Sequence, residues 1–400
     1  TYNNIGLVYS QMGRYSESLS NYEKALQIQQ KFLPPDHPDL GTTYNNIGVV
    51  CSQMGRYSES LSKCEKALKI RQKSLPPDHP SLATTYGNIG LVYLQMGRYS
   101  ESLSNYEKAL EIQQKSLPPD HPDLAITYNT IGSVYSKMGR YSESLSNYEK
   151  ALQIQQKSLP PDHPDLATTY NNIGLVYSQM GRYSESLSNY EKALQIQQKF
   201  LPPDHPDLGT TYNNIGVVCS QMGRYSESLS KCEKALKIRQ KSLPPDHPSL
   251  ATTYGNIGLV YLQMGRYSES LSNYEKALEI QQKSLPPDHP DLAITYNTIG
   301  SVYSKMGRYS ESLSNYEKAL QIQQKSLPPD HPDLATTYNN IGLVYSQMGR
   351  YSESLSNYEK ALKIRQKSLP PDHPDLATTY NTIGSVYLQM GRYSESLSNY

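Results

Sequence analysis

The 400-residue sequence lacks any apolar run long enough to cross a bilayer, and its first residues carry no secretory signal. It also contains no Asn-x-Ser or Asn-x-Thr acceptor for N-linked sugars, which removes one support for a secreted glycoprotein. We therefore expect a cytoplasmic protein that has no membrane partner.

Signatures of catalysis are missing as well. The chain has no glycine-rich phosphate loop, no His-x-x-x-His pair and no Gly-x-Ser-x-Gly elbow. These absences argue against an enzyme, and we expect neither a cofactor nor a metal ion.

Neither sign of charge is in excess, because 38 Lys and Arg residues stand against 37 Asp and Glu residues. This near balance argues against nucleic acid as the main partner. One basic run and its copy depart from the balance, and we interpret both as a solvated outer face of a helix. They are Lys63, Lys66, Lys69, Arg71 and Lys73, with the copy from Lys231 to Lys241.

What the sequence does contain is a 42-residue period. All nine histidines follow it, at His37, His79, His121, His163, His205, His247, His289, His331 and His373. Residues 169–336 also repeat residues 1–168 without a change. The period predicts one continuous array over residues 1–400. Its repeats are 1–42, 43–84, 85–126, 127–168, 169–210, 211–252, 253–294, 295–336, 337–378 and a partial repeat 379–400.

The two ends of the chain cut through repeats. Thr1 lacks the Pro-Asp-Leu or Pro-Ser-Leu start of every later repeat, and Tyr400 comes before the Ala-Leu pair that each complete repeat contains. There is also no initiator methionine. We expect the chain to be a fragment of a longer array.

Within one repeat, the apolar spacing is helical. Steps of four and three residues predict a first helix that ends at Gly55, through Leu40, Tyr44, Ile47, Cys51 and Met54. The same rhythm predicts a second helix that Pro76 and Pro77 terminate, through Tyr57, Leu61, Cys64, Leu68 and Leu75. Cys51 and Cys64 replace two core tyrosines, and we expect them to be buried, reduced thiols in contact.

The stretch Leu-Pro-Pro-Asp-His-Pro precedes each first helix and admits two interpretations. A row of Asp-His pairs suggests metal binding or catalysis, but a zinc site needs three or four converging ligands, and neighbouring helix layers are roughly 10 Å apart. The alternative is structural. His79 suits the N-cap of a helix, and Pro80 suits its first turn. We favour the structural role.

These residues resemble a known family. Tyr2-x-x-Ile5-Gly6-x-x-Tyr9, then Gly13, and Ser18-x-x-x-Tyr22 with Ala25, are similar to the tetratricopeptide (TPR) pattern. The 42-residue period and the Asp-His-Pro junction resemble the variant found in kinesin light chains. The resemblance implies an all-α, right-handed α-solenoid of antiparallel helix pairs, a superhelix whose concave groove is lined by the first helices and binds peptide or protein segments.

A helical wheel places candidate groove residues opposite the core stripe of each first helix. Most of them are Asn or Leu, which offer amide hydrogen bonds and apolar contacts to a peptide. They are Asn3, Leu7, Asn45, Val49, Gly87, Leu91, Leu94, Asn129, Lys137, Asn171, Leu175, Asn213, Gly255, Leu259, Leu262, Asn297, Lys305, Asn339 and Leu343.

The composition of this stripe limits the ligand. Lys137 and Lys305 are its only charged residues, so clamping of a carboxylate is not favoured. The third repeat is the most pocket-like, because Gly87 removes a side chain beside Leu91 and Leu94.

Three functional interpretations remain open from the sequence. The first is a non-enzymatic scaffold that binds protein or peptide partners in the groove. The second is a structural rod or filament of near-identical repeats, with self-association of the chain. The third is the recognition arm of an enzyme whose catalytic domain lies outside this sequence. We favour the first.

Overall fold

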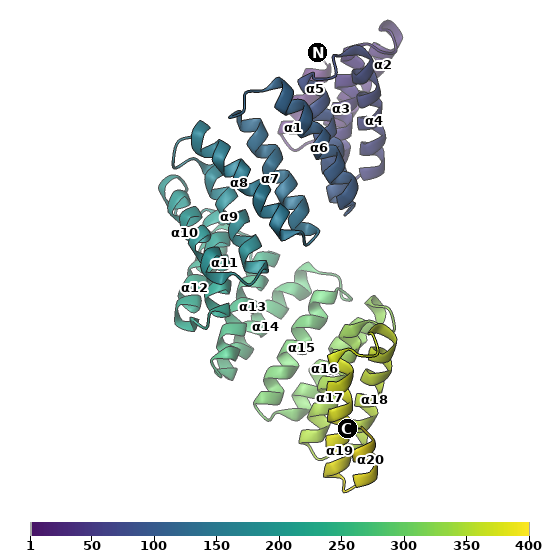
Figure 1. Ribbon diagram of the computed structural model, residues 1–400, viewed down its shortest axis with the longest axis vertical. Helices are drawn as coiled ribbons and strands as arrows, with labels where there is room; N and C mark the ends of the chain where they lie inside the picture. The colour runs from purple at the N-terminus through teal and green to yellow at the C-terminus, as the bar shows by residue number, and fades with distance from the viewer. Residues whose placement is uncertain (1, 400) are drawn as a thin grey trace. The chain divides into compact units, whose positions relative to one another are not determined.

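A computed structural model describes residues 2–399, and these residues form twenty α-helices and no strand (Figure 1). The predicted all-α solenoid of helix pairs is confirmed. The chain divides into two compact units, Thr1–Phe200 and Leu201–Tyr400. Helices α1–α10 belong to the first unit and α11–α20 to the second. The single continuous array stays a prediction.

The odd-numbered helices open each repeat and are called A helices here; the even-numbered ones are B helices. The A helices are α1 (Tyr2–Gln11), α3 (Pro38–Gln53), α5 (Pro80–Gln95), α7 (Pro122–Lys137), α9 (Pro164–Gln179), α11 (Pro206–Gln221), α13 (Pro248–Gln263), α15 (Pro290–Lys305), α17 (Pro332–Gln347) and α19 (Pro374–Gln389). The B helices are α2 (Tyr15–Phe32), α4 (Tyr57–Ser74), α6 (Tyr99–Ser116), α8 (Tyr141–Ser158), α10 (Tyr183–Phe200), α12 (Tyr225–Ser242), α14 (Tyr267–Ser284), α16 (Tyr309–Ser326), α18 (Tyr351–Ser368) and α20 (Tyr393–Asn399).

A histidine occupies the N-cap of each A helix from α3 onward, as the sequence predicted. The Nδ1 atom of His37 accepts a hydrogen bond from the backbone N–H of Asp39 at 3.2 Å, and Pro38 occupies the first helical position. This contact satisfies one of the backbone donors that the first turn leaves unpaired. The Asp-His-Pro stretch is therefore a helix start.

Both helices of a repeat also end where the sequence predicted. Gly55 follows α3 with a φ of +74°, a conformation that favours glycine, and the N–H of Arg56 then donates to the carbonyl of Cys51 at 2.8 Å. Helix α4 ends at Ser74, where Leu75 turns extended ahead of Pro76.

A glycine in each A helix lets the paired B helix come close. A Cβ atom added to Gly6 would lie 2.9 Å from the ring of Tyr22. The Oγ of Ser18 also donates to the carbonyl of Gly6 at 2.7 Å, in the buried space between α1 and α2. In the second repeat the buried thiol of Cys64 takes the place of the tyrosine ring.

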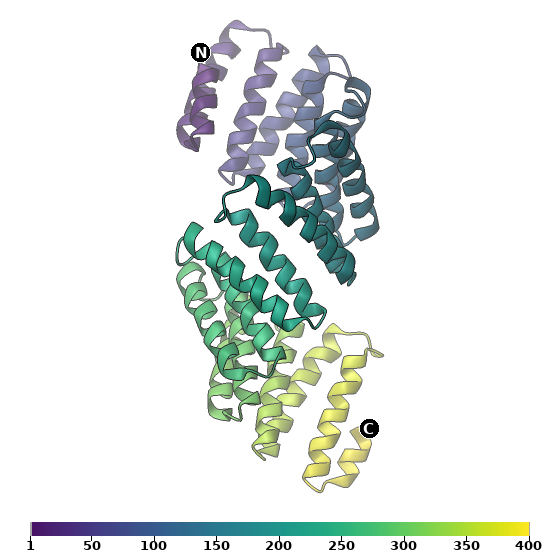
Figure 2. The same ribbon diagram turned by 90° about the vertical axis from the view of Figure 1, so that its left-hand side faces the viewer.

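The hydrophobic core runs between repeats within each unit. Leu103 and Tyr106 of α6 pack against Ile131 and Val134 of the following A helix, α7. Equivalent clusters join α8 to α9 and α16 to α17. Each helix pair thus lies beside the next one of its unit (Figure 2). A single repeat buries its apolar surface only when it has a neighbour, as is usual in solenoids.

The cysteines are buried, as predicted from their core positions. Cys51 and Cys64 are both completely inaccessible. Burial raises the pKa of the Cys51 thiol to about 11 and that of Cys64 to about 12. Both thiols are therefore protonated at neutral pH. The predicted contact between them stays a prediction.

The histidine N-cap supports a first prediction. Replacing His121 with Ala removes the acceptor for the Asp123 N–H and should lower the free energy of unfolding by about 1 kcal/mol. Hydrogen exchange should show the first turn of α7 opening faster. His121→Asn keeps an acceptor at the N-cap and should retain wild-type protection. Equal exchange in the alanine variant and the wild type would contradict the capping role.

The buried tyrosines support a second prediction. Burial raises the pKa of Tyr106, Tyr148, Tyr274, Tyr316 and Tyr358 to about 12. An unfolded tyrosine loses its proton near pH ~10. Between these two pKa values the folded protein keeps phenol protons that the unfolded chain has lost. The free energy of unfolding is therefore unaffected below pH ~10 and falls as the pH rises from there towards about 12, by roughly 2–3 kcal/mol per tyrosine.

Urea unfolding followed by circular dichroism across this alkaline range measures the loss. The control replaces the same five tyrosines with phenylalanine, which keeps the ring but cannot ionise. We expect the pH dependence of this variant to be much flatter. If both proteins lose stability equally, other groups cause the alkaline unfolding.

Candidate functional site

The candidate groove residues divide into an accessible group and an enclosed group. The accessible side chains are the leucines of the A helices, with exposed fractions of 50% for Leu7, 42% for Leu91 and 46% for Leu175. Their counterparts Leu259 and Leu343 are exposed at 37% and 46%, and Lys137 and Lys305 are also exposed. These leucines are therefore exposed, and their role in a peptide groove stays a prediction.

The enclosed group consists mainly of asparagines. Asn45 and Asn213 are buried, with 6% of each residue exposed. The remaining candidates are half-buried: Asn3, Val49, Gly87, Leu94, Asn129, Asn171, Gly255, Leu262, Asn297 and Asn339. The surface of the A helices that carries the accessible and the enclosed candidates is called the A-helix face.

The asparagines connect one A helix to the next. Asn3 Nδ2 donates to Thr43 Oγ1 at 2.8 Å, and Asn129 and Asn297 make the same contact with Thr169 and Thr337. At Asn45 the pattern differs, since its Oδ1 accepts from Asn88 Nδ2 at 3.1 Å. These asparagines were predicted to form hydrogen bonds with a ligand, but part of their hydrogen-bonding capacity is already used between repeats.

Three of these amides keep an unused acceptor. The Oδ1 atoms of Asn3, Asn129 and Asn297 are shielded from solvent and have no hydrogen-bond partner among the described residues. An unpaired buried acceptor costs about 1–3 kcal/mol.

A cavity of about 380 Å³ opens on the A-helix face between α15 and α17. Of the predicted residues, it contains Asn297. The other lining residues were missed: Ile294, Thr298, Ser301, Gln323, Asp333, Thr336 and Asn340. The sequence contained one signal for this cavity, because Ile126 and its copy Ile294 stand where the other repeats have Thr. In the structure these two isoleucines are 56% and 57% exposed.

The pocket predicted in the third repeat stays a prediction, although Gly87 and Gly255 face open space. A Cβ atom added to Gly87 or to its copy Gly255 would meet no atom within 4 Å. The space beside the exposed Leu91 is therefore accessible to a ligand side chain.

One interpretation of the sequence is wrong. Arg71 was placed on a solvated outer face, but only 7% of it is exposed, and only 6% of its copy Arg239. Its Nη1 donates to the carbonyl of Ser81 at 2.9 Å and to Thr85 Oγ1 at 2.6 Å. The reason is that the C-terminal half of a B helix packs against the next A helix, so this position faces inward.

The environment of Arg71 lacks a counter-charge. Desolvation lowers the pKa of the guanidinium, and in the part of the chain that the structure describes no carboxylate lies within ion-pair distance of it. Only the A helices that follow Arg71 and Arg239, α5 and α13, have Ser instead of Asp after their first proline, at Ser81 and Ser249. This substitution was the sequence signal for the burial of the two arginines.

Within residues 2–399, no group of three or more His, Cys, Asp or Glu side chains is placed to hold a metal ion. Over the same residues, no helix is both long and apolar enough to span a membrane. The A-helix face offers amides, hydroxyls and exposed leucines, which suit the recognition of a polypeptide.

Three solved structures are similar to this chain to different degrees, the first two with TM-scores above 0.5. A Signal Transduction ATPase with Numerous Domains (STAND) protein with a tetratricopeptide repeat sensor, from Pyrococcus horikoshii, is 14% identical with a TM-score of 0.60, covering 85% of this chain and 51% of its own. The apo form of RapI is 19% identical with a TM-score of 0.52, covering 69% and 94%. A Podosopora anserina protein described as a kinesin light chain, with nearly identical TPR-like repeats, is 23% identical with a TM-score of 0.47, covering 52% and 98%.

No curated protein matches the sequence. The tetratricopeptide repeat family model, however, matches it from end to end in nine overlapping segments. These are residues 1–73, 42–115, 81–157, 123–199, 165–241, 207–283, 249–325, 291–367 and 333–400. The chain therefore belongs to the tetratricopeptide repeat family.

Proposed function

We propose that this chain is a non-enzymatic scaffold that binds extended peptide segments along the A-helix face of each unit. Tetratricopeptide repeats are generally protein-interaction modules, typically without catalytic activity. The observation that carries the finer proposal is the cavity between α15 and α17, which combines amides and hydroxyls with an exposed apolar side chain.

The polar lining suits a peptide backbone. Thr298, Ser301 and Asn340 bring hydroxyl and amide groups from two successive A helices to one cavity. An extended chain presents N–H and C=O groups that need partners once water is displaced. Asn297 also lines the cavity.

The apolar lining suits the side chains of the same peptide. Ile294 is exposed beside the cavity, and Leu259 and Leu343 are exposed on the A helices α13 and α17. Exposed leucines at intervals along the face offer contacts for apolar residues of a ligand that follows it.

Charge favours neutral or basic ligands at this cavity. Asp333 is its only charged lining residue. Among the predicted groove residues of the second unit, Lys305 is the only charged one. The carboxylate of Asp333 would repel an acidic ligand at this cavity.

The test begins with peptides selected on the purified chain from a random display library. Replacing Leu91 and Leu259 with Asp should weaken the selected peptides by about tenfold or more, because it places charge where apolar side chains pack. Melting should change little, since both leucines are substantially exposed. Binding is measured by fluorescence anisotropy and melting by circular dichroism.

The matched control replaces Phe32 and Phe200 with Asp. These residues are 74% and 38% exposed but lie at the ends of B helices, so the control should bind the peptides normally. Peptides that lose affinity for the control and keep it for the leucine variant bind elsewhere, which would refute the proposal. Unfolding of the leucine variant would show that the leucines belong to the core.

A further inference from the structure

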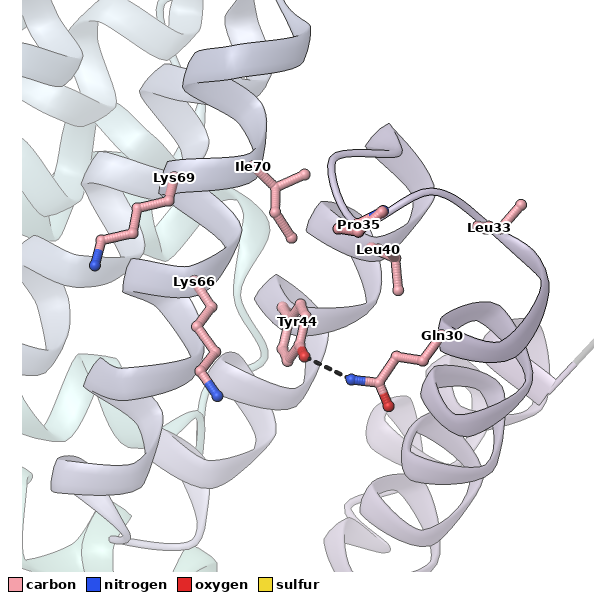
Figure 3. Close-up of a pocket in the computed structure, with 8 residues that line it drawn as sticks. All are labelled: Gln30, Leu33, Pro35, Leu40, Tyr44, Lys66, Lys69 and Ile70. Carbon is pink, nitrogen blue, oxygen red and sulfur yellow. Dashed lines mark hydrogen bonds between the residues drawn. The ribbon is translucent and has the colours of Figure 1, made fainter.

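A second kind of cavity recurs where one B helix meets the next repeat. The first, of about 400 Å³, is lined by Gln30, Leu33, Pro35, Leu40, Tyr44, Lys66, Lys69 and Ile70 (Figure 3). Equivalent positions line cavities of about 460, 320 and 430 Å³ in other repeats. These junction pockets share no repeat position with the cavity on the A-helix face.

The interior of the first junction pocket is apolar and held in place. Leu40 and Ile70 are buried at 3% and 9% exposure, and Pro35 closes one side from the loop. The hydroxyl of Tyr44 accepts a hydrogen bond from Gln30 Nε2 at 2.9 Å, which fixes the ring between α2 and α4 (Figure 3). Tyr128 and Tyr338 are held in the same way by Gln114 and Gln324.

The rim is cationic. The ammonium of Lys66 lies 5.7 Å from the centre of the Tyr44 ring and that of Lys63 lies 6.0 Å away. Lys69 extends outward from α4 (Figure 3). Over residues 2–399, none of these three lysines makes an ion pair, whereas Lys73 pairs with Asp36 at 3.4 Å. The charge of the rim is therefore available to a ligand.

The repeats differ at one position of this rim. Lys69 has lysine counterparts at Lys237 and Lys363, which line two of the other junction pockets. In the third and seventh repeats the same position holds Glu111 and Glu279. Those glutamates pair with Lys115 and Lys283 at 2.7 Å, which neutralises charge there. The chain thus contains cationic and neutralised versions of one junction.

We propose that the lysine-bearing junction pockets form a second binding surface, which takes acidic protein segments. An apolar side chain of the segment rests on Leu40 and Ile70, and the carboxylates on either side of it pair with Lys66 and Lys69. This proposal does not rest on peptide binding at the A-helix face, because the two surfaces have no residue in common.

The apolar interior decides between an acidic peptide and a nucleic acid. A polyanion is held by phosphate contacts spread along a basic surface. Here the unpaired lysines surround a cavity of about 400 Å³ lined by Leu, Ile, Pro and Tyr. The volume is in the range of pockets that enclose ligand groups. An isolated apolar side chain between carboxylates uses both the interior and the rim.

The experiment uses the full chain and a fluorescein-labelled synthetic peptide with a central leucine flanked by aspartates and glutamates. Replacing Lys69, Lys237 and Lys363 with Glu should weaken its binding about tenfold at low salt, since attraction becomes repulsion. Folding should persist, because Glu111 and Glu279 occupy this position naturally. Conversely, replacing Glu111 and Glu279 with Lys should strengthen binding.

A charge-matched control replaces Lys24, Lys137 and Lys305 with Glu. None of them lines a junction pocket described above, and two belong to the A-helix face. The control should bind the acidic peptide as the wild type does. A peptide in which Ser replaces the leucine, and one with Asn and Gln in place of the acids, should both bind more weakly.

Several results would overturn the proposal. Equal losses in the junction variant and the control would show that only net charge matters. Equal binding of the leucine and serine peptides would show that the cavity is not used. Displacement of the peptide by a single-stranded DNA oligonucleotide that depends on the same lysines would identify a polyanion surface instead.

Discussion

The close contact between a glycine of an A helix and a side chain of its paired B helix is the constraint on which the structure depends. That side chain is a tyrosine in most repeats and a cysteine, Cys64 or Cys232, in the second and sixth. Gly6 leaves room for Tyr22, and Ser18 fixes the two backbones by donating to the glycine carbonyl at 2.7 Å. This contact fixes the packing of the two helices of a pair, and the same B helix packs against the next A helix. The A-helix face and the junction pockets are the surfaces left open by that arrangement.

The starts and ends of the helices were predictable because they depend on nearby residues. His37 caps α3 by accepting from the N–H of Asp39, two residues further on, and Gly55 ends the same helix through its positive φ. The burial of Arg71 and Asn45 was not predictable in the same way, since both contact the following repeat, at Thr85 and Asn88. A helical wheel describes one helix and contains no information on its neighbours. The exposed leucines were found because their outward position is a property of one helix.

The two proposed surfaces differ in the charge they present. On the A-helix face, the cavity between α15 and α17 has Asp333 as its charged group, whereas Lys66 and Lys69 line the first junction pocket. The near-zero net charge of the chain, with 38 basic and 37 acidic side chains, hides this separation. The separation is incomplete, because Asp120 and Asp204 also line junction pockets and Lys305 lies on the A-helix face. If both proposals hold, the two surfaces would select chemically different segments.

Duplication gives these sites a further property. Residues 169–336 repeat residues 1–168, so Lys69 and Lys237 line copies of the same junction pocket, one in each unit. If these pockets bind acidic segments as proposed, two identical sites in one chain would favour a ligand with two such segments, because binding of the first raises the local concentration of the second. The gain requires no new contact, only a linker that spans both sites. If the proposal holds, near-identical repeats would favour a repetitive or multivalent partner, since divergence of one of two copies would remove the entire multivalent gain.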